Sequence, residues 1–213
     1  MRGIALGVLC WLVIATGSAV AQAPAGALGS ERFAQIDAVY AAAVALDEPD
    51  APASALTAFR RTCNELGRAD PLLAALRTVC LSEVRAYRAL TPASQCDPLS
   101  LHPRKCLKLY RKVDATLGET ISRSREANSV IASQVPDTGC RAELRASAAD
   151  IRFIKRARRA FRLLARAVLH FDRTGDGDDV VRALERLAGL PEQPSVASER
   201  ARFQRACGPS QPL

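Results

Sequence analysis

Acidic side chains are crowded between Asp172 and Asp179, where the sequence reads DRTGDGDD. Oxygen atoms at alternate positions of a short loop are the ligands that Ca²⁺ takes up in its flexible coordination. The candidate ligands are Asp172, Thr174, Asp176 and Asp178. The sequence therefore predicts a calcium site, with the ion stabilising the fold rather than sensing a signal. Calcium is the one cofactor that the sequence suggests.

The first half of this segment resembles the calcium loop of EF-hand proteins. The resemblance runs from Phe171 to Asp178 and places Gly177 at the sharp turn. It implies a helix on each side of a loop that ligates the ion at alternate positions. Beyond Asp178 the chain departs from the family pattern, because Ala183 stands where the family has a bidentate glutamate and Asp179 where it has an aliphatic residue. This departure puts a complete ligand set in doubt.

The same loop has an alternative interpretation without a metal. Gly175 can end one helix in the left-handed conformation. Asp178 can cap the next helix, and Asp176 and Asp179 suit its positive N-terminal end. Both interpretations stay open on the sequence alone.

A second feature is a dense row of cationic side chains between residues 145 and 166. At 100° per residue, the apolar side chains from Phe153 to Phe171 fall within an arc of about 100°, and the cationic ones lie opposite within about 160°. Residues 141–173 hold ten Lys or Arg and three Asp or Glu, and the whole chain has a net charge of +8. Most of the basicity therefore belongs to one helix. The predicted binding face is made of Arg152, Arg156, Arg159, Arg162 and Arg166, flanked by Arg145, Lys155 and Arg158.

This face predicts an anionic partner, which would be an acidic protein, a polyanionic polymer or a lipid surface. Nucleic acid is disfavoured, because the chain has few aromatic rings for stacking and a signal for export. An internal partner is the alternative. Residues 31–50 hold five acidic residues and one basic residue, and would neutralise the face if the first helix packed beside it. A merely solvated face is the other alternative.

The N-terminus has the three parts of a secretory signal peptide, which we assign to residues 1–21. Arg2 supplies a positive charge, residues 4–17 form an apolar run, and cleavage is expected near Ala21 after a small-x-small motif. The protein is therefore expected to be secreted or periplasmic. No transmembrane anchor is expected, because no later run approaches ~20 apolar residues.

Six cysteines follow the predicted signal peptide, and in an exported chain an even number indicates disulfides. They are Cys63, Cys80, Cys96, Cys106, Cys140 and Cys207. Their spacing matches neither a zinc site nor a thiol redox motif. Three disulfides are predicted. The best single pairing is Cys96–Cys106, since it closes a short loop onto the next helix, and the others cannot be chosen from the sequence.

Alanine, leucine and arginine dominate the rest of the chain, and all three favour helices. The expected helices span residues 30–46, 53–67, 71–91, 103–134, 140–171, 178–189 and 195–206. Short loops should join them into an all-α, disulfide-stapled antiparallel helical bundle of about six to seven helices. A single helical domain over 30–208 is expected between a flexible N-terminal tail, 22–29, and a C-terminal tail, 209–213.

The sequence disfavours an enzyme. His102 and His170 are the only histidines, and no catalytic or phosphate-binding motif occurs. We therefore expect an exported, non-enzymatic binding or structural protein that contacts an anionic partner through residues 145–166. One alternative is a calcium-stabilised helical protein centred on 172–178. Another is a hydrolase that uses unidentified carboxylates, because two acids suffice for glycoside cleavage.

Overall fold

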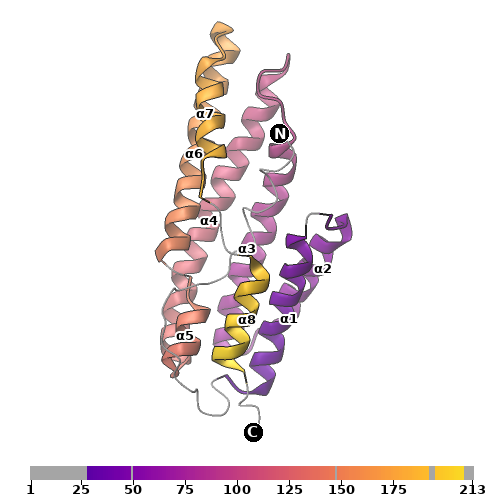
Figure 1. Ribbon diagram of the computed structural model, residues 1–213, viewed down its shortest axis with the longest axis vertical. Coiled ribbons are helices and arrows are strands. Elements are labelled where there is room, and N and C mark those ends of the chain that lie inside the picture. The colour runs from indigo at the N-terminus through magenta and orange to yellow at the C-terminus, as the bar shows by residue number, and fades with distance from the viewer. Residues whose placement is uncertain (1–27, 49, 147, 192–194, 209–213) are drawn as a thin grey trace.

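The computed structural model describes residues 28–48, 50–146, 148–191 and 195–208, and this part of the chain is all-α (Figure 1). The helices are α1 (Ser30–Asp47), α2 (Ala53–Glu65), α3 (Pro71–Ser94), α4 (Pro103–Gln134), α5 (Thr138–Leu144), α6 (Ala148–Thr174), α7 (Asp178–Ala188) and α8 (Val196–Cys207). The predicted signal peptide, its cleavage near Ala21 and both predicted tails lie outside the described residues, apart from residues 28 and 29. None of the described helices has the length and apolar composition needed to cross a bilayer.

The prediction of one helix over 140–171 is wrong, because the structure has two helices there. Arg145 adopts an extended conformation with φ −87° and ψ 132°, which ends α5. The Asn128 side chain on α4 then bonds both backbone groups of Ala146, accepting from its N–H and donating to its C=O at 3.0 Å each. A side chain from another helix therefore satisfies polar groups that a continuous helix would satisfy itself.

Two apolar cores lie along α3 and α4, which contribute to both. The first core gathers α1, α2, α5 and α8 around the first half of α3 and the last turns of α4. The second core gathers α6 and α7 around the second half of α3 and the first half of α4. Figure 1 shows this division, with α6 and α7 toward one end of the long axis and α1, α2, α5 and α8 toward the other.

Three disulfides form, as predicted from the cysteine count. Cys96–Cys106 joins the end of α3 to the start of α4, which confirms the predicted pairing. Cys63–Cys80 joins α2 to α3, and Cys140–Cys207 joins α5 to α8. Two of the disulfides therefore hold together elements of the first core, and the third closes the turn between the two long helices.

Candidate functional site

Helix α6 presents the predicted cationic face to solvent. Its apolar side chains, including Phe153, Phe161 and Leu164, are buried in the second core. The opposite side carries six exposed cationic residues: Arg152, Lys155, Arg156, Arg159, Arg162 and Arg166. The strong amphipathicity of this segment thus positions the row, because burial of one side of a helix turns the other side outward.

One carboxylate of α4 neutralises part of the row. Asp114 Oδ1 accepts hydrogen bonds from Arg158 Nε at 2.7 Å and from Arg162 Nε at 2.8 Å. Gly118, one turn later on α4, leaves room for the first guanidinium, since a Cβ there would lie 2.8 Å from Arg158 Cζ. A single acidic group therefore orients two arginines against α4.

The other cationic residues of the row have no such partner. Within the described part of the chain, no ion pair or hydrogen bond involves the side chains of Arg152, Lys155, Arg156, Arg159 or Arg166. Like charges at i,i+4 destabilise a helix by a few tenths of a kcal/mol per pair, and Arg152–Arg156 and Lys155–Arg159 are such pairs. The face thus carries repulsion that the described residues do not relieve.

The expectation that residues 31–50 neutralise this face is wrong. Helix α1 packs against α2 and α8 instead of α6. Arg200 of α8 binds Asp37 through two hydrogen bonds of 2.9 and 2.8 Å, and these bonds hold the pKa of Asp37 below its usual value. Asp47 accepts the Val196 backbone N–H at 3.4 Å. The acidic residues of α1 therefore serve the first core, away from α6.

Helix α4 adds cations that the sequence analysis missed. Arg104, Lys105, Lys108, Arg111 and Lys112 are all exposed. Two ion pairs join α4 to α6, Arg104 with Asp172 and Asp114 with Arg158. The two helices therefore run antiparallel, and the turns between these contacts lie side by side. Residues 104, 108 and 111 share one side of α4, because positions three, four and seven apart coincide on a helix. The motif RKCLKLYRK at 104–112 was the available signal.

We define the cationic face as the exposed basic residues of both helices. Its members are Arg104, Lys108 and Arg111 of α4 and Arg152, Lys155, Arg156, Arg159, Arg162 and Arg166 of α6. It lies over the second core, whereas the acidic residues of α1 belong to the first core. The molecule therefore has an uneven distribution of charge along its length.

The loop between α6 and α7 contains the four predicted calcium ligands. Asp172 binds Arg104 Nε at 2.9 Å, and its side chain is 15% exposed. Thr174 Oγ1 donates to the His170 carbonyl at 3.0 Å and accepts the Asp176 N–H at 3.2 Å. Across the described part of the chain, no group of three or more His, Cys, Asp or Glu side chains is arranged to hold a metal ion. The first predicted ligand is thus engaged by an arginine.

The ends of the two helices follow the metal-free interpretation in part. Gly175 has φ +77° and its N–H bonds the Phe171 carbonyl at 2.8 Å, as expected of a glycine that ends a helix. The prediction that Asp178 caps α7 is wrong, because the helix begins at Asp178 and Gly177 is its N-cap. Asp176 Oδ1 instead accepts the Asp178 N–H at 3.0 Å. An aspartate two residues before the predicted one therefore supports the start of α7.

Calcium binding stays a prediction, and a thermal melt with EDTA and then with millimolar calcium tests it. If Asp172 exchanges Arg104 for the ion, Tm should rise by several degrees, since a ligand that binds the folded state alone stabilises it. Arg104→Gln, which frees the carboxylate, should increase the rise, and Asp172→Asn should abolish it. An unchanged Tm in all three proteins would rule out the site.

Comparison with known proteins adds no relative. No family model matches the chain, and neither a curated protein nor a solved structure has significant similarity to it. Function is therefore inferred from the chemistry of the chain's own residues.

Proposed function

We propose that the chain is an exported, non-enzymatic helical protein, folded as an antiparallel bundle, that binds a polyanionic polymer on the cationic face. The observation that carries this proposal is the row of five exposed α6 cations without an ion pair in the described residues. A partner with repeated negative charges would relieve their mutual repulsion and gain a large summed attraction.

The geometry of the face favours a linear polyanion. From Arg152 to Arg166 the row follows a straight stretch of helix about 21 Å long, at 1.5 Å per residue. Arg104, Lys108 and Arg111 widen the row on the neighbouring helix. A chain of regularly spaced anionic groups can follow such a strip. A compact acidic protein would need a surface whose shape is complementary to it.

Lipid headgroups are a weaker candidate for the same face. Among the described residues, the large hydrophobic side chains that are exposed are Leu99, Leu101 and Val181, and none lies on α4 or α6. A helix that lies in a membrane surface buries an apolar side in the lipid, but the apolar side of α6 is committed to the second core. Attraction to lipid would therefore be electrostatic alone.

The charges themselves provide the first test. Replacing Arg156, Arg159 and Arg166 together by Gln should weaken binding to heparin on the order of 100-fold, at about 1 kcal/mol for each cation near an anionic surface. The measurement is Kd by titration over a range of salt concentrations, where the variant should also lose salt dependence because it releases fewer counterions.

A matched control separates position from net charge. Arg60, Arg68 and Arg88 are exposed and lie outside α4 and α6, in or next to α2 and on α3. Changing these three to Gln removes the same charge. Heparin affinity should stay within about twofold of wild type, because substitutions outside a binding site change its free energy by only a few tenths of a kcal/mol. Equal losses in both triple variants would contradict a defined face. Binding to anionic vesicles but not heparin would assign the face to lipid.

Asp114 provides a test in the opposite direction. Asp114→Asn removes the carboxylate that holds Arg158 and Arg162, so affinity for heparin should rise several-fold. Stability should fall by about 1 kcal/mol, because charge-assisted hydrogen bonds at a partly exposed site are lost. Glu119→Gln is the control, since Glu119 pairs with Arg85 on the other side of α4. An Asp114→Asn affinity at or below wild type would contradict the proposal.

A further inference from the structure

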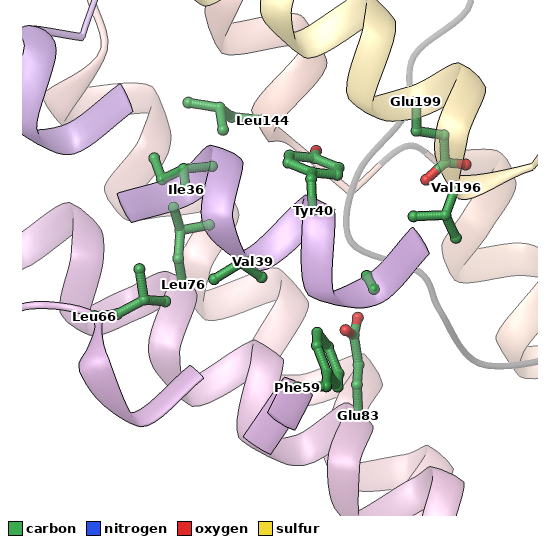
Figure 2. A pocket seen from close by; sticks show the side chains of 11 residues that line it. Ile36, Val39, Tyr40, Phe59, Leu66, Leu76, Glu83, Leu144, Val196 and Glu199 are labelled. Carbon is green, nitrogen blue, oxygen red and sulfur yellow. The ribbon is translucent and has the colours of Figure 1, made fainter. Parts of the chain in front are cut away.

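A small cavity inside the first core carries two buried glutamates (Figure 2). It has a volume of about 30 Å³, which admits one or two water-sized groups. Among the described residues of its lining, Glu83 of α3 and Glu199 of α8 carry the carboxyl groups. The rest of the lining is Ile36, Val39, Tyr40, Ala43, Phe59, Leu66, Leu76, Leu144 and Val196. Among the described residues that line the cavity, none belongs to the cationic face, so the two sites can be tested separately.

Both glutamates are enclosed and incompletely bonded. Glu83 is 2% exposed and Glu199 is 1% exposed. Glu83 Oε1 and both carboxyl oxygens of Glu199 have no hydrogen-bond partner among the described residues. Figure 2 shows the two side chains reaching the cavity from different helices, with Phe59 beside Glu83. A buried polar atom without a partner destabilises a fold by about 1–3 kcal/mol, so the site has unmet bonding capacity.

The helical spacing explains how polar residues come to be here. Glu83 lies four residues after Val79 and three after Cys80, both fully buried. Glu199 lies between Val196 and Phe203, three and four residues away, and both of these are buried as well. Each glutamate therefore occupies a core position of an amphipathic helix. A carboxyl group at such a position lowers the stability of the fold relative to a leucine, which suggests that it is kept for binding or another function.

Burial favours the protonated form of both carboxyl groups. It raises the pKa of Glu83 well above its usual value. It also raises the pKa of Glu199 to about 9. The positive charge of Arg202 acts against this rise but is outweighed by burial, and the nearby acids Asp150, Glu83 and Asp47 add to it. Arg202 lies 3.5 Å from Glu143 Oε2 on α5, and the pKa of Glu143 is raised by burial too. One arginine therefore faces several carboxyl groups around α8.

A hydrolytic role does not fit this pair. Glycoside cleavage needs one carboxyl group to be ionised while the other holds a proton, in surroundings that separate the two. Here burial acts on both groups in the same direction, and the small apolar cavity leaves no cleft for a sugar. The chemistry that remains is binding.

The lining specifies what would bind. Among the described residues that line the cavity there is no lysine, arginine or histidine, and the nearby Arg202 is paired with Glu143, so an anionic ligand would find little opposite charge. A small cation with N–H donors would meet two carboxyl groups, one of which can give up its proton, and the aromatic rings of Tyr40 and Phe59, whose faces also attract cations. We propose that the cavity binds a small primary ammonium, of ammonium or methylammonium size, with its N–H groups bonded to Glu83 and Glu199. The ammonium takes the place of one carboxyl proton, which passes to solvent, so that the bound ion lies between one carboxylate and one carboxylic acid.

The protonation of the empty site is tested first, by stability against pH. Because the folded pKa of both acids is raised above the unfolded value, the folded state binds more protons between those values. Stability is then full below the unfolded pKa of about 4.5 and is lost as pH rises toward about 9. Glu83→Gln with Glu199→Gln should remove this loss and raise Tm near pH 8, with little effect near pH 4. Glu185→Gln, at an exposed position, should leave the pH profile unchanged.

The ligand is tested by thermal melts of the oxidised chain at neutral pH. Ammonium and methylammonium chloride should raise Tm by about 3–6 °C at a tenfold excess over Kd, relative to sodium chloride of the same ionic strength. Tetramethylammonium, which is larger and has no N–H donor, should have no such effect. Binding in weak buffer should also acidify the solution, as up to one carboxyl proton is released for each ion bound.

The variants decide whether the glutamates are responsible. The Glu83→Gln, Glu199→Gln double variant should lose both the rise in Tm and the proton release, whereas Glu185→Gln should keep both. Equal melting in all the salts, or an equal rise in the double variant, would overturn the proposal and leave a cavity that holds water alone. If the double variant does not fold, the comparison of salts and the proton release in the wild-type chain still decide it.

Discussion

The antiparallel contact between α3 and α4 is the interaction on which the rest of the structure depends. These two helices supply buried side chains to both cores, so neither core can form without them. The Cys96–Cys106 disulfide closes their junction, and Arg85 of α3 pairs with Glu119 of α4 at 2.6 Å further along. Helices α2, α5 and α6 pack directly against this pair, whereas α1, α7 and α8 are placed by packing against those three helices. The cationic face and the cavity thus lie on different halves of one scaffold.

The amphipathic patterns predicted most of the fold. The all-α class, the position of six helices, three disulfides and the Cys96–Cys106 pairing are confirmed. These features depend on local propensity, on periodic burial and on short loops, all of which are present in a single segment of sequence. The outward orientation of the arginines on α6 followed from the same pattern.

Features that depend on distant residues could not be predicted in this way. The break between α5 and α6 has no glycine or proline, and the Asn128 side chain that stabilises it comes from the preceding helix. The alternative in which the acidic residues 31–50 pack beside the cationic residues 145–166 is wrong. Charge complementarity between exposed groups is a weaker constraint than apolar packing, which places α1 against α2 and α8. The burial of Glu83 and Glu199 does have a local signal, since both fall on the apolar side of their helices. A helical projection of α3 and α8 reveals it, because it places each glutamate among the apolar residues of its helix.

The Cys140–Cys207 disulfide has a consequence for how the chain could change in length. Its two cysteines are 67 residues apart, and between them the chain leaves the first core, builds α6 and α7 and returns as α8. The hairpin of α6 and α7 is therefore comparable to an insertion whose two ends are joined by a disulfide. Lengthening or shortening that hairpin by whole helical turns, together with the facing end of α3 and α4, would extend or shorten the charged strip. The half of the molecule that encloses the cavity would keep its packing.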